Sequence, residues 1–373
     1  MKKKVHIALV GGQTMPVILG IKESFPDEVI LVHSEKSASE AKHIENLCSE
    51  ECNLQEFPPV DYDTIKVSVN KLLHKLTDDE ITINLSGGTK PWALSFALQT
   101  QGMKNVTLLY IDQNSVCYNY TQQKKWTCKG LNMEELMQYN GQLAKSHILL
   151  DDYTEDDLDI LQAIKAIRQY NFNDFNRLTI PGKDGQKKIN NQSKGTLQTS
   201  NGSYIEWNKK ENYITLSLSG KYGFKENTFE SPHIMQIVFN SGWFEYDVAL
   251  MISKWKYAKE IWLNTIYPYN NKYPKNEIDI IVNTGYKLLM IECKTQIYDN
   301  TDIDKFNTAV KNYGGLGSKA LFITDAKMKP EAIEKCSDNH ILSFSMKDFE
   351  NRQSAQESLF QLLDKELFYI NTK

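Results

Sequence analysis

Two carboxylates and one ammonium group lie close together in residues 276–295, NEIDIIVNTGYKLLMIECKT. This stretch is typical of a β-hairpin, because an apolar run is followed by a turn at 283–285 and then by a second apolar run. Successive side chains of a strand point to opposite faces, so Glu292 and Lys294 are expected on the same face. Asp279 enters from the first strand. The sequence therefore predicts that these three charged groups meet at one end of the hairpin.

Oxygen ligands of this kind suit Mg²⁺ or Mn²⁺. We predict that Asp279, Glu292 and the backbone carbonyl of Cys293 hold such an ion. A water on the ion can lose its proton near neutral pH and attack phosphorus, while Lys294 stabilises charge on the phosphoryl oxygens. The alternative is a surface hairpin with a salt bridge. It is disfavoured because Glu292 follows an apolar run, and a buried carboxylate needs a partner.

The pattern resembles the PD-(D/E)xK core of restriction-endonuclease-like nucleases, with Asp279 as the first acid and residues 292–294 as the (D/E)xK. In that fold the helix before the hairpin often supplies a further acid. Apolar residues at helical spacing predict a helix over 242–257, which places Glu245 in that position. The resemblance implies that Glu245, Asp279, Glu292 and Lys294 are catalytic. Glu245 has an alternative role as a solvated acid in the first turn of a helix. Glu277 could replace or assist Asp279, but we expect it to be a neighbour on the rim instead.

The composition is that of an ordinary globular chain. The 373 residues suffice for two domains and a small insert. A formal net charge of −4 gives no general attraction to nucleic acid, so any such binding must come from local patches. Six cysteines without a CxxC pair indicate reduced thiols in a cytoplasmic protein. The apolar run near the start is too short to span a bilayer, so no membrane association is expected.

Strands and helices alternate in the first third of the chain. Apolar runs predict strands at 5–10, 28–33, 81–85 and 106–112, and the intervening segments predict helices beginning at Pro16, at 37–51, at 65–76 and from Pro91 to 101. This alternation is typical of a doubly wound α/β domain, which binds ligands at the carboxyl ends of its strands.

Two glycine-containing turns fall on that edge, at 11–14 and 86–90. Each leads into a helix amino terminus, where free backbone N–H groups favour anions such as phosphates. Neither turn is a GxGxxG or Walker motif, so a dinucleotide cofactor or nucleotide hydrolysis is not indicated. The alternative for each turn is an ordinary connection between a strand and a helix that binds no ligand.

The segments VHIALVGGQTMPVILGI and ITINLSGGTKPWALSFAL resemble two strand-loop-helix units of a CARF domain, the CRISPR-associated Rossmann-like sensor of cyclic oligoadenylates. A CARF domain followed by a PD-(D/E)xK core resembles the Can/Card group of type III CRISPR ancillary nucleases. The resemblance implies a homodimer that holds cyclic tetra-adenylate on its twofold axis. It also implies that the bound ring switches on metal-dependent cleavage of single-stranded RNA and DNA.

Carried over to this sequence, the resemblance implies that two loops and their neighbours line the ring, namely Gly12, Gln13, Thr14, Met15, Ser34, Ser86, Gly87, Gly88, Thr89, Lys90 and Trp92. Two roles are open for Trp92, which is expected either to stack on adenine or to pack in the core. The resemblance divides the chain into a sensor at 1–145, a linker helix with a small basic β insert at 146–229, and a nuclease domain at 230–373.

The middle segment carries no assignable motif. Residues 155–170 are typical of an amphipathic helix, and 204–207 with 213–218 predict a small hairpin. Residues 181–210, which include the first strand of this hairpin, hold six lysines against two acids. We expect a solvated loop there, and the alternative is a lysine-lined lip that guides a phosphate backbone toward the metal.

Three functions remain open from the sequence. The favoured one is a nuclease gated by a cyclic oligoadenylate. The second is an ungated repair or restriction nuclease that uses its α/β domain for assembly. The third is a non-catalytic regulator that senses the ring and binds nucleic acid.

Overall fold

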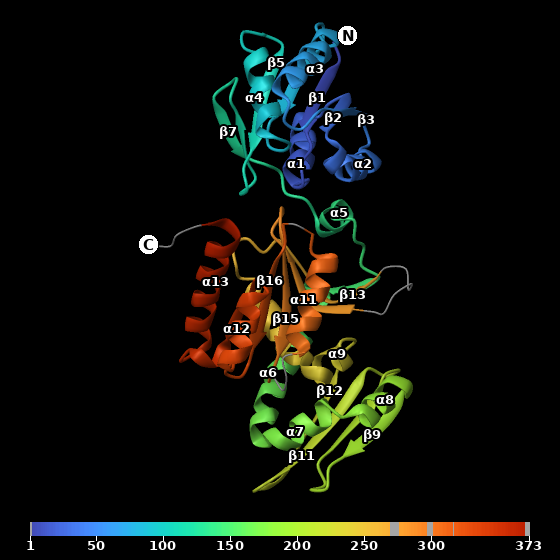
Figure 1. Cartoon of the computed structure of the whole chain (residues 1–373). Helices are drawn as coiled ribbons and strands as arrows, with labels where there is room; N and C mark the ends of the chain where they lie inside the picture. The colour runs from blue at the N-terminus through green and yellow to red at the C-terminus, as the bar shows by residue number, and fades with distance from the viewer. Residues whose placement is uncertain (1, 269–275, 297–300, 316, 370–373) are drawn as a thin grey trace.

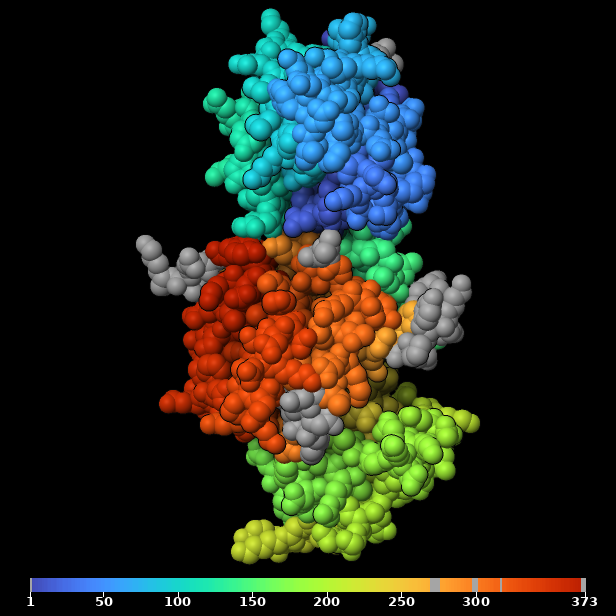
Figure 2. Space-filling model, in the orientation of Figure 1, coloured from blue at the N-terminus to red at the C-terminus, as the bar shows by residue number. Residues whose placement is uncertain are grey.

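The computed structural model describes residues 2–268, 276–296, 301–315 and 317–369. The molecule is elongated and consists of three units in a row (Figure 1). We name them the first, middle and far units. The first unit contains a seven-stranded sheet, the middle unit a six-stranded sheet and the far unit a four-stranded sheet. The space-filling view shows the same three-part outline, with the middle unit between the other two (Figure 2).

The sheet of the first unit has the strand order β3-β2-β1-β4-β5-β6-β7. Its strands are β1 (Lys4–Leu9), β2 (Glu28–His33), β3 (Glu51–Glu56), β4 (Glu80–Asn84), β5 (Val106–Ile111), β6 (Val116–Asn119) and β7 (Lys124–Thr127). The first five are parallel, and β6 and β7 are antiparallel additions. Helices α1 (Met15–Ser24) and α2 (Ala38–Leu47) pack on one face of the sheet, and α3 (Tyr62–Lys75) and α4 (Lys90–Gln99) on the other. The predicted doubly wound domain is confirmed.

Two details of that prediction are wrong. The helix expected over 37–51 ends at Leu47, and β3 follows it as an edge strand. The β3 sequence, ECNLQE, is largely polar because this strand has a neighbour on one side only. The strand series was expected to close at Asp112, but the antiparallel pair β6 and β7 extends the sheet beyond it.

The middle unit has the strand order β17-β16-β15-β14-β13-β8. Its strands are β8 (Ser146–Leu149), β13 (Glu260–Tyr267), β14 (Asn276–Asn283), β15 (Leu288–Lys294), β16 (Lys319–Thr324) and β17 (Ile341–Ser345). Its helices are α5 (Met133–Tyr139), α6 (Glu155–Tyr170), α9 (Ile234–Val238), α10 (Gly242–Ile252), α11 (Thr301–Tyr313), α12 (Pro330–Asp338) and α13 (Arg352–Phe368). Strand β8 pairs with β13, so residues from the predicted linker complete this sheet. The helix predicted over 242–257 ends five residues early, at Ile252.

The far unit replaces the loop expected over 181–210. It contains α7 (Phe172–Thr179), α8 (Lys183–Asn191), β9 (Lys194–Gln198), β10 (Tyr204–Asn208), β11 (Tyr213–Gly220) and β12 (Gly223–Glu230). The predicted hairpin corresponds to β10 and β11, whereas α8 and β9 were missed because their polar sequences bury few side chains. Lys188 Nζ donates to the Thr196 carbonyl at 2.6 Å, and Lys209 Nζ donates to the Ile189 carbonyl at 2.5 Å. These two lysines therefore tie helix α8 to strand β9 and to the residue that follows β10.

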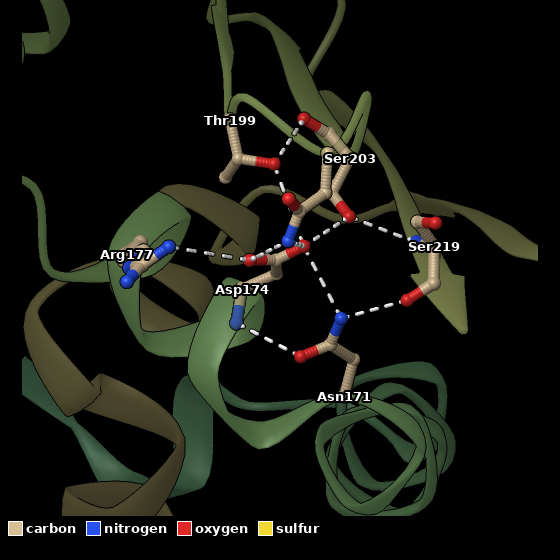
Figure 3. Close-up of polar contacts among 7 residues, drawn as sticks. Asn171, Asp174, Arg177, Thr199, Ser203 and Ser219 are labelled. Atoms are coloured by element: carbon tan, nitrogen blue, oxygen red, sulfur yellow. Dashed lines mark hydrogen bonds and ion pairs between the residues drawn. The ribbon is translucent and has the colours of Figure 1, made fainter. Parts of the chain in front are cut away.

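A buried polar network fixes the turns of the far unit (Figure 3). Asp174 of α7 is only 1% exposed and accepts a hydrogen bond from Ser203 Oγ at 2.6 Å. Ser203 Oγ in turn accepts from the Ser219 amide at 2.8 Å, and Asn171 Nδ2 donates to the Ser219 carbonyl at 2.7 Å. These contacts satisfy the buried carboxylate and join helix α7 to the β9–β10 turn and to the end of β11.

Candidate active site

Strands β14 and β15 form the predicted hairpin, with Ile280 paired to Ile291 and Asn283 paired to Leu288. Its alternation is confirmed, because Leu289, Ile291 and Cys293 share one apolar core while Leu288 and Met290 belong to the other. The regular pairing of the two strands ends at Ile280 and Ile291, so Asp279 and Glu292 lie immediately beyond the last pair. The hairpin is thus buried on both faces, and its charged residues gather where the regular pairing stops.

Three of the predicted charged groups meet at this end. Asp279 Oδ2 accepts a hydrogen bond from the Cys293 amide at 2.7 Å, which ties the carboxylate to the neighbouring strand. Lys294 Nζ donates to Glu292 Oε1 and lies 3.8 Å from Asp279 Oδ2. One ammonium group therefore bridges two carboxylates, as the strand alternation predicts.

Glu245 joins the cluster from helix α10. Its Oε2 accepts from Asn264 Nδ2 at 2.9 Å, and the same amide lies 3.3 Å from Glu277 Oε1. Glu245 and Asp279 are each only 9% exposed. The alternative of a solvated Glu245 is therefore wrong. Asn264 was not predicted, because it lies on β13, whose sequence shows no motif that connects it to the hairpin.

The backbone before α10 positions Glu245. Asn240 and Ser241 both have positive φ angles, of 55° and 71°. Ser241 Oγ lies 3.0 Å from Thr295 Oγ1, which directly follows Lys294. At Gly242 an added Cβ would lie 1.7 Å from the Gln236 carbonyl oxygen, so only glycine fits the start of this helix. The sharp bend and the glycine bring the first turn of α10 against the charged end of the hairpin.

Burial and mutual repulsion disfavour ionisation of the acids. Burial raises the pKa of Glu245 and Asp279, and the neighbouring Asp279 carboxylate raises the pKa of Glu245 further. Burial and Asp279 raise the pKa of Glu292 to about 8. Burial alone would lower the pKa of Lys294, but Asp279 and Glu292 outweigh that effect and raise it. The cluster thus holds more negative groups than its one ammonium can neutralise.

A cluster of buried carboxylates that repel one another fits a divalent cation, which would favour their ionised forms. Asp279, Glu292 and the Cys293 carbonyl remain the proposed ligands. Within the described ranges, no three His, Cys, Asp or Glu side chains are arranged as a metal-binding group. A two-carboxylate set with one carbonyl agrees with the preference of Mg²⁺ for keeping several waters.

The two glycine turns of the first unit lie against each other. An added Cβ on Gly11 would be 3.0 Å from the Gly88 amide nitrogen, and Gly88 has a φ of +67°. Residues Gly12, Gln13, Thr14 and Met15 line a cavity between the first and middle units, which has a volume of about 490 Å³. Lys90 is exposed at the start of α4. The two turns therefore share one edge of the sheet, but only the first of them lines the cavity.

Several of the predicted ring contacts have structural roles in this arrangement. Trp92 is fully buried, and its Nε1 donates to the Pro58 carbonyl at 2.8 Å, so the packing alternative is correct and the stacking one is wrong. Ser34 is buried within a capping box with Ser37 and does not line the cavity. Ser86 Oγ accepts from the Ile111 amide at 2.7 Å. Gly87 contacts the Leu9 carbonyl so closely that a side chain would clash.

Comparison with known proteins identifies the class of the first unit. Residues 5–137 match the family model of the Card1 CARF domain. The first unit is therefore similar to the CARF domain of Card1, and the resemblance predicted from the two glycine turns is confirmed. No curated protein sequence matches the chain.

Solved structures resemble the whole chain. Can2 from Sulfobacillus thermosulfidooxidans, in complex with cyclic tetra-adenylate, aligns with a TM-score of 0.64 and 17% identity over 98% of this chain and 99% of its own. Protein VC1899 from Vibrio cholerae aligns with a TM-score of 0.70 and 14% identity over 96% and 97%. A type III CRISPR defence DNA nuclease activated by cyclic oligoadenylate aligns with a TM-score of 0.55 and 13% identity over 98% of this chain and 52% of that one. These identities show the fold, and the predicted fold class is confirmed.

Proposed function

We propose that the protein is a metal-dependent endonuclease of type III CRISPR defence that cyclic tetra-adenylate activates and that cleaves single-stranded RNA and DNA. The observation that carries this proposal is the buried group formed by Glu245, Asp279, Glu292 and Lys294 in a chain that also contains a CARF domain. The fold shared with Can2, solved with cyclic tetra-adenylate, supports the choice of ring.

The residues divide the chemistry between them. Asp279, Glu292 and the Cys293 carbonyl would hold Mn²⁺ or Mg²⁺, which supplies Lewis-acid activation of the attacking water when bound. Lys294 places one positive charge beside the scissile phosphate and stabilises the charge that develops on its oxygens. Glu245, fixed by Asn264, is positioned to accept a proton or to orient water.

A cleavage assay on single-stranded RNA and DNA, with and without cyclic tetra-adenylate and Mn²⁺, tests this function. The proposal predicts cleavage only when both are present. Cleavage that needs the metal but ignores the ring would indicate the ungated repair or restriction nuclease. Ring binding without cleavage under any of these conditions would indicate the non-catalytic regulator.

No helix in the described ranges is long and apolar enough to cross a membrane.

An exposed apolar face of the first unit supports assembly as a homodimer. Val67 of α3 and Leu94 and Leu98 of α4 are 65%, 60% and 59% exposed. Helices α3 and α4 pack side by side (Figure 1), and α4 begins at Lys90 of the predicted ring-binding loop. A second copy covering this face would bring two such loops together, as a ring bound on a twofold axis requires.

Lys90→Ala is expected to raise the ring concentration needed for half-maximal activation about tenfold, because it removes a charge-assisted contact to phosphate. The maximal cleavage rate at saturating ring should stay within about twofold of the parent, since Lys90 lies in the CARF domain. Cleavage measured against ring concentration gives both values. Activation at an unchanged ring concentration would remove the second loop from the binding site.

The stability of the metal-free protein is expected to fall as the pH rises from about 4.5 to 8. Glu292, with its pKa raised to about 8, keeps in the folded state a proton that the unfolded chain has already lost in this window. Because Mn²⁺ binds the ionised carboxylates, it should raise the melting temperature more at pH 8 than at pH 6. Thermal melts of the parent and of Glu292→Gln measure this difference. An equal Mn²⁺ shift at both pH values in the parent would contradict it.

A further inference from the structure

The cavity between the first and middle units has a second wall. Gly12, Gln13, Thr14 and Met15 line it from the CARF domain, whereas Tyr286, Lys287 and Lys319 line it from the middle unit. The carboxyl end of β1 and the start of α1 point toward the middle unit (Figure 1). A ligand held by the first glycine turn would therefore also face the middle unit.

Lys287 carries a positive charge that is not neutralised. Its Nζ donates to the Leu367 carbonyl at 2.5 Å and lies 5.3 Å from the centre of the Phe368 ring. Among the described residues, no carboxylate lies within ion-pair distance of it. Burial and the nearby Lys319 lower the pKa of Lys287, and the Asp112 carboxylate opposes this shift without reversing it. A half-buried ammonium beside a second one is the arrangement expected of an anion site.

The acids around the cavity do not fill this role. Glu366 lies 3.9 Å from Lys319, and Glu40 belongs to the opposite wall. Asp112 Oδ1 accepts from the Asn114 and Val116 amides, both at 2.9 Å, and the negative charge of this carboxylate favours the ammonium form of Lys287 without forming a recorded ion pair with it. In the part of the chain that the structure describes, Lys287 therefore lines the cavity with the Leu367 carbonyl and two aromatic rings as its direct contacts and without an ion-pair partner.

The same lysine lies next to the turn of the hairpin that carries the candidate catalytic residues. Lys287 directly precedes β15, whose other end carries Glu292 and Lys294, about 20 Å away for a strand of this length. Cavity and candidate active site therefore occupy the two ends of one buried strand.

The turn before Lys287 is also tied to the chain that leaves the CARF domain. The Leu131 amide donates to the Gly285 carbonyl at 2.8 Å, and Asn283 Nδ2 donates to the Leu131 carbonyl at 2.8 Å. Tyr286 Oη donates to the Cys128 carbonyl at 2.6 Å. A change in the position of the CARF domain would thus act directly on the turn that joins β14 to β15.

We propose that Lys287, with Lys319 beside it, forms an anion subsite on the middle unit that takes a phosphodiester group of the ligand bound by residues 12–15. The identity of that ligand as a cyclic oligoadenylate rests on the proposed function. Through this subsite the catalytic hairpin contacts the activator directly. Activation then requires that the ligand bind more tightly to the arrangement in which Lys287 reaches its phosphate than to any other arrangement.

Two measurements on the full chain test the subsite. In the first, mass spectrometry follows amine-selective labelling of Lys287, with inorganic phosphate or cyclic tetra-adenylate as the probe and exposed Lys327 as the internal control. The expected result is that either probe lowers labelling of Lys287 at least about threefold and leaves Lys327 unchanged. Labelling of Lys287 that neither probe alters would overturn the proposal.

In the second measurement, Lys287→Gln and Lys287→Arg are compared in ring-activated cleavage, with melting temperatures recorded to confirm folding. Lys287→Gln should raise the ring concentration for half-maximal activation about tenfold, and Lys287→Arg should restore most of the loss because it keeps the charge. Equal activation of the parent and Lys287→Gln would overturn the subsite. A parent protein that the ring does not activate would instead refute the proposed function, while protection of Lys287 by inorganic phosphate would still support the subsite.

Discussion

Glu292→Ala is expected to lower the cleavage rate about 10³-fold or more while affinity for cyclic tetra-adenylate changes less than about twofold. The substitution removes a proposed metal ligand and the carboxylate that Lys294 contacts. The proposed ring site is centred on residues 12–15 of the first unit, across the cavity from the start of β15, whereas Glu292 lies near the other end of that strand. Single-turnover cleavage in Mn²⁺, together with a direct ring-binding measurement, separates the two effects.

Glu277→Gln is the matched control for this experiment. Glu277 lies two residues before Asp279 and shares the Asn264 amide with Glu245, yet we place it at the rim. Its substitution should lower the rate less than about tenfold. If Glu292→Ala cleaves at the parental rate in Mn²⁺ and Glu277→Gln does not, the ligand assignment is wrong.

The double substitution Leu94→Glu with Leu98→Glu is expected to convert the proposed dimer to a monomer and to weaken ring-dependent activation about 100-fold. Two carboxylates on the exposed face of α4 would have to be buried without partners if a second copy covered it. Half of a twofold ring site would also be lost with the partner. Light scattering after gel filtration gives the mass, and the cleavage assay gives the activation.

Leu158→Glu provides a matched control for the dimer, since Leu158 is 41% exposed on α6, outside the CARF domain. It should leave mass and activation unchanged. A double variant that remains dimeric and fully activated would show that α4 is not the interface.

The hairpin could be predicted because its signals are local. Strand alternation alone places Glu292 and Lys294 on one face, and the apolar run before them indicates burial. Asn264 could not be found in this way. Asn264 comes close to Glu245 only because β13 pairs with β14, and this pairing joins strands that no local sequence signal connects.

For the loops predicted to bind the ring, the sequence suggested ligand contacts that the structure does not show. Position in a motif suggested that Trp92 and Ser34 face a ligand, but the loops close on themselves, so Trp92 fills the core beneath them and Ser34 caps a short helix. The sequence gives no signal for Lys287 as a cavity residue, because nothing in its neighbours indicates that the CARF domain lies opposite it.

The far unit illustrates a further limit. Its polar strand β9 and helix α8 resemble a loop in composition, and they are held by buried contacts such as Asp174 with Ser203 that join distant parts of the chain.

The most direct test of the metal site is anomalous diffraction from crystals soaked with Mn²⁺ and cyclic tetra-adenylate. We predict one strong Mn²⁺ peak about 2 Å from oxygens of Asp279 and Glu292 and from the Cys293 carbonyl, with Lys294 beside it. The account would be contradicted if, in crystals of active protein, Mn²⁺ bound elsewhere and Asp279 and Glu292 contacted only Lys294.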